Sequence, residues 1–263
     1  TELTQDEFLG GRLRLWQPKA GYRAGVDPVI LAASVPAVAG QSVLDLGCGI
    51  GTAGLALMAR VPDVQVTGVE VQAFYADLAR RNAQENAMAL AVIEADLAVL
   101  PKELRAVTFD HVIANPPYFD RGASVPAPLG IREKAMGEVT PLALWIDVAA
   151  RRVKPRGYVT FIHRAERVPE VLGLMAARLG SLQVLPLTPR VGREAQLCLI
   201  RGRKTGRAAF RLHTGVVMHE GAGHPGDRES YTPLLQSVLR DEFGFDGFVV
   251  SGAFLSFFNK LFW

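Results

Sequence analysis

The stretch that decides the fold is Ser42-Val43-Leu44-Asp45-Leu46-Gly47-Cys48-Gly49-Ile50-Gly51-Thr52. A short, mostly apolar run ends here in glycines, and a helical stretch follows over residues 52–60. Glycine is needed where the backbone turns sharply or a ligand comes close, because a Cβ would clash there. The stretch therefore predicts a strand, a ligand-binding turn and a helix.

The acidic residue before the glycines, Asp45, indicates which kind of ligand the turn binds. Residues 49–54 match the pattern G-x-G-x-x-G, which on its own suggests a dinucleotide site but is a weak signal. Asp45 lies two positions ahead of the first glycine. A carboxylate at that position suits a cofactor with a cationic amino group better than one with a pyrophosphate.

Outward from this turn, strand-like and helical stretches alternate. We expect strands at 42–46, 64–69, 91–95, 109–114 and 158–162, and helices at 52–60, 72–87 and 140–153. Strands separated by 10–15 residues of helix predict a parallel sheet. Two closer strands, at 182–187 and 195–200, suit an antiparallel hairpin. The prediction is an α/β domain with a seven-stranded, mostly parallel sheet, helices on both faces and a C-terminal antiparallel hairpin.

Bulk composition fits one globular domain over residues 1–240. Hydrophobic residues make up 49% of the 263 residues, and 29 basic against 26 acidic residues leave a net charge of +3, which tolerates a polyanion without requiring one. Cys48 and Cys198 are too few for a disulfide framework. Together with charges in residues 1–26 that argue against a signal peptide, they favour a cytoplasmic protein.

The last segment differs from the rest of the chain. Residues 241–263 are rich in phenylalanine but too interrupted for a membrane-spanning helix. This tail could dock on the body, contact a membrane or be an unnatural extension. The body itself is expected to need no membrane, and no spacing of His, Cys or Asp predicts a metal site.

Polar residues close four successive predicted strands: Asp45, Glu70, Asp96 and Asn115. In an open α/β sheet, ligands bind beyond the carboxyl ends of the strands. Glu70 follows the glycine loop by about 20 residues, where a carboxylate can accept both ribose hydroxyls of a cofactor. Asp96 can accept a hydrogen bond from an adenine amino group. Four such residues in register predict a nucleoside-type cofactor.

The tetrapeptide Asn115-Pro116-Pro117-Tyr118 predicts the reaction. An exocyclic amino nitrogen is a poor nucleophile, because its lone pair is conjugated with the ring or carbonyl. The Asn115 side-chain oxygen and the Pro116 carbonyl can accept its two N–H groups and stabilise the positive charge that develops. The prolines restrict the backbone, and Tyr118 offers a flat face for stacking an extruded base.

With these motifs, the chain resembles the class I, Rossmann-like, S-adenosylmethionine-dependent methyltransferases, and the tetrapeptide resembles the N-P-P-Y/F signature of amino-methyltransferases. The same tetrapeptide serves adenine-N6, guanine-N2 and glutamine-N5 methylation. The resemblance implies that S-adenosyl-L-methionine is the cofactor. The residues that it implies for cofactor binding are Asp45, Gly47, Cys48, Gly49, Gly51, Glu70, Val71, Asp96, Leu97 and Asn115.

Further stretches resemble one bacterial family, the valine-tRNA adenine-N6 methyltransferases, over roughly residues 8–240. They are Gln17-Pro18-Lys19-x-Gly21-Tyr22-Arg23, Asp27-Pro28-Val29-Ile30-Leu31-Ala32, His163-Arg164-Ala165-Glu166-Arg167, Arg201-Gly202-Arg203-Lys204, His219-Glu220-Gly221 and Tyr231-Thr232. The resemblance implies a tRNA substrate, methylated on the adenine next to the anticodon. It also implies that residues 1–40 cover the cofactor through Tyr22, Arg23 and Asp27. The tail departs from the family pattern.

Basic residues occur in three runs, at 151–156, 190–193 and 201–211. Phosphate contacts supply most non-specific affinity for nucleic acid, so a basic patch is its footprint. We expect the third run to bind RNA through Arg201, Arg203, Lys204 and Arg207. The sequence does not show whether the runs converge on Asn115.

Three other functions stay open at this stage. Glutamine-N5 methylation of release factors uses the same tetrapeptide, but those enzymes usually carry a substantial helical domain before the core. Guanine-N2 methylation of ribosomal RNA would need only a different base pocket. A non-catalytic module binding RNA or membrane would not need both the cofactor loop and the tetrapeptide. Neither the particular tRNA nor the oligomeric state follows from the sequence.

Overall fold

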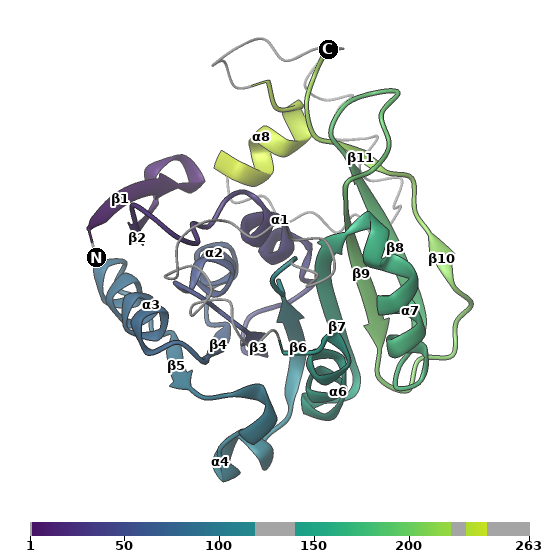
Figure 1. The fold of residues 1–263 in the computed structure, drawn as a ribbon, viewed down its shortest axis with the longest axis horizontal. Coiled ribbons are helices and arrows are strands. Elements are labelled where there is room, and N and C mark those ends of the chain that lie inside the picture. Colours follow the sequence, from purple (N-terminus) through teal and green to yellow (C-terminus); the bar gives the residue numbers. More distant parts are fainter. Residues whose placement is uncertain (1, 119–139, 222–229, 241–263) are drawn as a thin grey trace, which may run out of the picture.

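The computed structural model describes residues 2–118, 140–221 and 230–240, and its core is one twisted sheet (Figure 1). The strand order is β10-β8-β9-β7-β6-β3-β4-β5, and β11 pairs with β8. The strands are β3 (Ser42–Leu46), β4 (Gln65–Glu70), β5 (Ala91–Glu94), β6 (Phe109–Ala114), β7 (Val153–Arg164), β8 (Gly180–Thr188), β9 (Leu197–Arg203), β10 (Arg211–Leu212) and β11 (Val216–Val217).

Pairing confirms the predicted parallel sheet with a C-terminal hairpin. The strands β3 to β7 pair in parallel, while β9 is antiparallel to both β7 and β8. The sheet has nine strands instead of the predicted seven, because β10 and β11 add to β8. Each of these strands has two residues, too few to show any periodicity in the sequence.

Helices cover both faces of the sheet (Figure 1). On one face lie α1 (Asp27–Ser34), α2 (Thr52–Arg60), α3 (Ala73–Glu85) and α8 (Pro233–Arg240), and on the other α4 (Lys102–Arg105), α6 (Leu142–Arg152) and α7 (Val168–Ala176). Short 3-10 turns are η1 (Leu9–Gly11), η2 (Leu97–Val99) and η3 (Ala165–Arg167).

The helix α6 shows why these segments are helical. Leu142, Trp145, Ile146 and Ala149 are buried at the spacing of one helical face, and they pack into the core between α6 and the sheet. The equivalent pattern was not recognised in α7, whose described buried side chains are only Val171 and Met175. Two buried positions are too few to separate a short helix from a loop.

A separate antiparallel hairpin precedes the sheet and was not predicted. It joins β1 (Leu3–Phe8) to β2 (Leu13–Pro18). In β2 the side chains of Leu13 and Leu15 are fully buried and Arg14 between them is exposed. This alternation is the ordinary signal of a half-buried strand, but it extends over few residues.

Asn82 on α3 fastens the hairpin to the body. Its Oδ1 accepts from the Trp16 backbone N–H at 2.7 Å, and its Nδ2 donates to the carbonyls of Trp16 at 3.2 Å and Ile50 at 3.0 Å. The side chain is fully buried. One residue thus joins the hairpin, α3 and the glycine loop.

Asn82→Ala is expected to lower the free energy of unfolding by about 3 kcal/mol, because the buried Ile50 carbonyl and the part-buried Trp16 N–H both lose their hydrogen bond to Asn82. Urea unfolding followed by circular dichroism measures the change. Asn86→Ala, at the residue that caps the same helix, removes hydrogen bonds to the exposed Arg14 backbone and to the Asn82 carbonyl, and should cost about 1 kcal/mol. Equal losses in the two variants would contradict the proposed role of Asn82.

The C-terminal end of the described chain is α8. Its Leu235 and Val238 are buried in the core on the α1 face, and Arg12 Nη2 donates to the Arg240 carbonyl at 3.0 Å. The predicted aromatic tail, residues 241–263, lies outside the described residues. In the part of the chain that is described, no helix has the length and apolar character to cross a membrane.

Candidate active site

The glycine loop turns at the carboxyl end of β3. Gly47, Gly49 and Gly51 have φ angles of 65°, 54° and 87°, a backbone region that glycine adopts readily. A Cβ on Gly47 would lie 2.4 Å from Trp145 of α6, so this position also has no room for a side chain. The Cys48 N–H donates to the Val69 carbonyl at 3.0 Å, which ties the loop to β4.

Glu70 fixes the loop from the end of β4. Its Oε2 accepts from the Gly49 N–H and its Oε1 from the Gln72 N–H, both at 2.9 Å. Burial raises the pKa of Glu70, while these backbone hydrogen bonds oppose the rise. Each carboxylate oxygen has a second lone pair, so Glu70 can still accept from the hydroxyls of a ligand. The neighbouring Val71 is 58% exposed, beside where such a ligand would lie.

Asp45 is a buried carboxylate with an unused oxygen. Its side chain is 2% exposed, and its Oδ2 has no hydrogen-bond partner among the described residues. Burial raises the pKa of Asp45 to about 7, a rise opposed by a hydrogen bond from Gly54 and increased by Glu70. An uncompensated buried carboxylate is costly. A cationic ligand group would remove that cost.

Asp45 borders a small cavity. The cavity has a volume of about 20 Å³, and Tyr22, Asn115 and Thr52 also line it. The hydroxyl of Thr52 is likewise buried without a partner in the described chain. Such a volume holds about one water-sized group. The carboxylate, the hydroxyl and the size of the cavity fit the ammonium group of S-adenosylmethionine, and sequence reasoning missed Thr52.

Asp96 and Leu97 follow β5 at the same edge of the sheet. The Oδ1 of Asp96 accepts from the Ala98 N–H at 2.8 Å and so caps η2. Asp96 is exposed and Leu97 is 8% exposed. The structure thus brings Asp45, Glu70 and Asp96 to one edge, as the strand order requires.

The tetrapeptide after β6 places an amide beside a phenol. The Tyr118 hydroxyl lies 2.9 Å from Asn115 Oδ1 and 2.9 Å from Asp27 Oδ2, so it faces two acceptors with one proton. A carboxylate is the stronger acceptor. Burial and the Asp27 charge raise the pKa of Tyr118, which therefore stays protonated. With its proton directed to Asp27, Tyr118 leaves Asn115 Oδ1 available to a substrate amino group.

Tyr118 contacts two residues from the end of β7, His163 and Arg164. Its ring lies 5.3 Å from the His163 ring, and the Arg164 guanidinium lies 5.8 Å from the Tyr118 ring centre. His163 is 2% exposed, and its Nδ1 accepts from the Arg164 N–H at 2.9 Å. Burial, with Arg167 and Arg164 nearby, lowers the pKa of His163 to about 4. His163 is therefore a neutral packing partner of Tyr118 at neutral pH.

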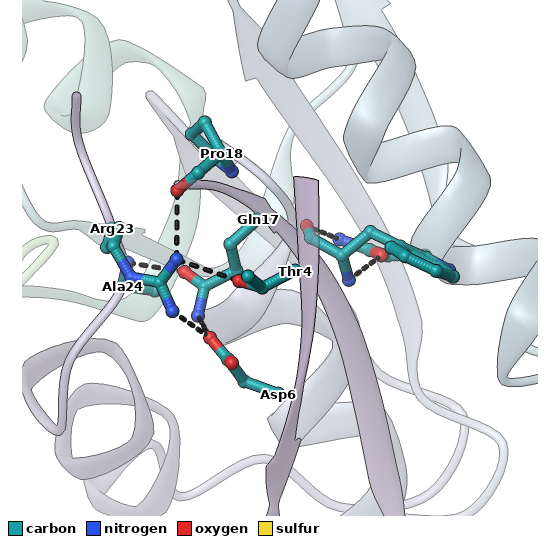
Figure 2. A network of polar contacts seen from close by, with 8 residues as sticks. Thr4, Asp6, Gln17, Pro18, Arg23 and Ala24 are labelled. Atoms are coloured by element: carbon teal, nitrogen blue, oxygen red, sulfur yellow. Dashed lines mark hydrogen bonds and ion pairs between the residues drawn. The ribbon is translucent and has the colours of Figure 1, made fainter. Parts of the chain in front are cut away.

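The covering segment has two parts with different partners. Tyr22 is 51% exposed, and its Cε1 lies 3.7 Å from the position of a Cβ on Gly49, so its ring covers the glycine loop. Arg23 instead bonds the hairpin: its Nη1 donates to Thr4 Oγ1 at 2.8 Å and to the Pro18 carbonyl at 2.9 Å, and its Nη2 pairs with Asp6 (Figure 2). The structure gives Arg23 these partners on the hairpin.

Gln17 completes this network. Its Nε2 donates to Asp6 Oδ2 at 2.6 Å and its Oε1 accepts from the Ala24 N–H at 2.8 Å (Figure 2). Gln17 is 2% exposed. The network ties the segment that carries Tyr22 to the hairpin, so the hairpin positions the cover of the loop.

Asp27→Ala and Tyr118→Phe are each expected to lower the methyl-transfer rate constant about tenfold, since each breaks one charge-assisted hydrogen bond. If Asp27 acts by holding the Tyr118 proton, the double variant should be no slower than Tyr118→Phe. Single-turnover assays at saturating cofactor measure these rate constants. Multiplicative losses would show that the two side chains act independently.

The basic runs do not gather at Asn115. The run after β9 and the run at the start of β7 converge at the amino-terminal edge of the parallel strands. Arg203 pairs with Tyr158, and Tyr158 pairs with His111 near the start of β6. Asn115 follows His111 by four residues, which is roughly 13 Å along the strand. Only the run at 190–193, with the exposed Arg193 in the β8–β9 turn, lies at the Asn115 edge.

For Arg201, predicted to contact nucleic acid, the structure shows a buried side chain. The side chain is 2% exposed, its Nε donates to Thr160 Oγ1 at 3.3 Å, and its Nη2 donates to the Ser34 carbonyl. The physical reason is that β9 is a central strand covered on both faces, so all of residues 198–202 are buried.

Arg203 is the last residue of β9, and Lys204 and Arg207 follow it. The Nε of Arg203 donates to the Arg156 carbonyl at 2.9 Å, and Lys204 Nζ donates to the Ala150 carbonyl at 2.6 Å. Arg207 is exposed. Their binding of nucleic acid stays a prediction, but it would take place far from Asn115. Among the described residues, no group of His, Cys, Asp and Glu could hold a metal ion.

The glycine loop after β3, the acidic edge and the tetrapeptide after β6 define a class I S-adenosylmethionine-dependent methyltransferase. Residues 25–131 match a family model, the methyltransferase small domain. A crystal structure from Agrobacterium tumefaciens, described as "a predicted O-methyltransferase", superposes with a TM-score of 0.67. It is 27% identical, and the match covers 83% of this chain and 97% of that one.

More narrowly, the chain belongs to the family of the tRNA1(Val) (adenine(37)-N6)-methyltransferases. The Porphyromonas gingivalis protein of that name is 30% identical over 200 residues, which are 69% of this chain and 76% of the relative. The Aeromonas hydrophila protein of that name is 28% identical over 213 residues, 80% of this chain and 88% of the relative. These comparisons confirm the predicted fold class and family.

Proposed function

We propose that this protein transfers the methyl group of S-adenosylmethionine to the exocyclic N6 amino group of an adenine in tRNA, next to the anticodon of valine tRNA. The observation that carries the reaction type is that Asn115 and Asp45 line one cavity, an amide acceptor beside a buried carboxylate whose Oδ2 has no hydrogen-bond partner among the described residues. The choice of a tRNA adenine as the methyl acceptor rests on the names of the relatives. Such an enzyme would act in the cytoplasm, where tRNA is modified.

The cofactor, when bound, supplies an electrophilic methyl group on a sulfonium. In this proposal Asp45 binds its ammonium group, Glu70 its ribose and Asp96 its adenine. The cofactor would lie close to the backbone of the glycine loop, at Gly47, Cys48, Gly49 and Gly51. The side chains of Val71, Leu97 and Tyr22 would lie along its nucleoside. Arg23 acts indirectly, through the hairpin.

Asn115 and Pro116 bind and orient the amino group that accepts the methyl group. The Asn115 Oδ1 and the Pro116 carbonyl accept the two N–H groups of the adenine amine, which opposes conjugation of its lone pair with the ring. These fixed dipoles also stabilise the positive charge on the nitrogen during transfer. Pro117 and Pro116 hold the two acceptors in place. The product loses its extra proton to solvent after transfer, so no strong base is required.

RNA would approach from the edge that carries Asn115. Tyr118 offers the stacking face for the extruded base, with Arg164 over its ring. Arg164 is half-exposed and Arg193 is exposed in the nearby turn, so both are available to phosphates. These two residues take the role in substrate binding that sequence reasoning gave to the run after β9.

The test is transfer of radiolabelled methyl groups to total tRNA from a strain that lacks the endogenous enzyme, followed by digestion to nucleosides. Label in N6-methyladenosine of valine tRNA is the expected result. Label only in N2-methylguanosine when ribosomal RNA is supplied, or only in release factor, would keep the enzyme class and overturn the acceptor. A tRNA with guanine in place of the target adenine is the matched control.

A further inference from the structure

A second hollow lies at the opposite edge of the sheet from Asn115. Its volume is about 460 Å³, far larger than the cavity beside Asp45, and within the range of small-molecule sites. It is lined by residues from the starts of β6, β7, β8 and β10 and from the end of β9. The lining thus includes residues of the two basic runs, 151–156 and 201–211, that converge away from the active site.

The charge of this pocket is strongly positive. Its basic lining residues are Lys154, Arg156, Arg201, Arg203 and Arg211, against one acidic residue among the described lining, Asp110. Asp110 is already paired with Lys154 Nζ at 2.9 Å. The lining therefore brings four guanidinium groups together with no second carboxylate among the described residues, and cations in one hollow repel one another. An anion in the pocket would remove that repulsion.

The wall of the pocket is an aromatic stack with an unused polar atom. The rings of His111 and Tyr158 are parallel within 7° at 6.1 Å, and the Arg203 guanidinium lies 5.2 Å from the Tyr158 ring centre. His111 is 4% exposed and its Nε2 lies 2.9 Å from Gln41 Oε1. Its Nδ1 has no hydrogen-bond partner within the described chain.

We propose that this pocket binds a phosphate ester, independently of the methyl-transfer site. Guanidinium groups match the oxygens of a phosphate in pairs, which favours phosphate over a single carboxylate. The volume exceeds what one phosphate needs, so the ester group also lies in the pocket, against Tyr158. His111 Nδ1 bonds an oxygen of the ligand, accepting from a phosphate hydroxyl or, once protonated, donating to it. The phosphate belongs to a free nucleotide or to an RNA backbone.

Isothermal titration calorimetry with adenosine monophosphate and with inorganic pyrophosphate tests the site without any methylation assay. The variant is Arg156→Gln with Arg211→Gln, because both side chains are exposed at the pocket. We expect one site on the native protein and at least about tenfold weaker binding in this variant. The control is Lys102→Gln with Arg105→Gln, which removes the same charge from exposed positions on α4.

Equal binding in the variant and the native protein, or equal loss in variant and control, would overturn the proposal. A nitrogen-15 spectrum of the histidines gives a second readout: the His111 Nδ1 signal is expected to move when pyrophosphate binds, and an unmoved signal contradicts the assigned contact. Thermal unfolding checks that both double variants are folded.

A third assay identifies the source of the phosphate. If it belongs to the RNA backbone, the Arg156/Arg211 variant raises KM for tRNA without changing kcat, and pyrophosphate competes with tRNA. If it belongs to a free nucleotide, the nucleotide binds and KM for tRNA is unchanged. An enzyme that fails to methylate tRNA leaves the calorimetric result unaffected, so the two proposals fail separately.

Discussion

Asn115→Ala is expected to lower kcat for tRNA by a factor of about 10² to 10³, the usual effect of removing one positioned group that stabilises transition-state charge. The alanine variant lacks the oxygen that accepts one N–H of the adenine amine, so the nitrogen keeps its conjugation with the ring. Rapid-quench measurement of a single turnover, at saturating cofactor and tRNA, gives the rate constant directly.

Binding separates this effect from a general disruption of the site. S-adenosylhomocysteine binding by Asn115→Ala should stay within about threefold of native, because Asn115 forms only one wall of the cavity at Asp45. Asn115→Asp is the matched variant, since it keeps an acceptor oxygen in nearly the same shape. A smaller loss of kcat is expected for aspartate than for alanine. Equal losses would mean that shape, not the acceptor, is what Asn115 supplies.

The parts of the fold that follow from local pattern were predictable. The strands at 42–46 and 109–114 and the helix at 52–60 have the expected bounds. Each combines an apolar run with clear turn signals, so no partner is needed to recognise it. The hairpin β1–β2 is stable only because Leu13 and Leu15 pack on the α1 face and Asn82 bonds its backbone. Those partners are far away in the sequence.

The candidate site divides in the same way. Asp45, Glu70, Asp96 and Asn115 could be placed together because parallel strands bring their carboxyl ends to one edge. The hydrogen bond between Tyr118 and Asp27 joins residues 91 positions apart and has no local signal. The position of Arg203 did have a local signal in the sequence. The predicted hairpin makes β9 antiparallel, so residues at the end of β9 must lie at the edge opposite to Asn115.

Cofactor affinity is expected to depend on pH through Asp45. Burial raises the pKa of Asp45 to about 7 from 3.8, so in the free protein the carboxyl group is neutral below that pH. An ammonium group binds the ionised form, and binding should weaken about tenfold for each pH unit below 7. Calorimetry with S-adenosylhomocysteine from pH 5 to pH 8.5 should therefore show affinity that rises with pH and levels off above about pH 7.

Asp45→Asn provides the decisive comparison, because stability and binding should change in opposite directions. A carboxyl group whose folded pKa is raised favours the protonated native state, so the stability of the free protein falls as pH rises from about 4 to about 7. Asparagine has no charge to bury, so the free variant should be more stable than native at pH 8, and less so at pH 5. Its affinity for S-adenosylhomocysteine should fall about 10²-fold at pH 7.5, the usual cost of removing one partner of a buried charge pair. The decrease in affinity below pH 7 that is expected for the native protein should also disappear. If the variant is less stable than native and its affinity for S-adenosylhomocysteine still decreases below pH 7, Asp45 is a structural residue and another group binds the ammonium.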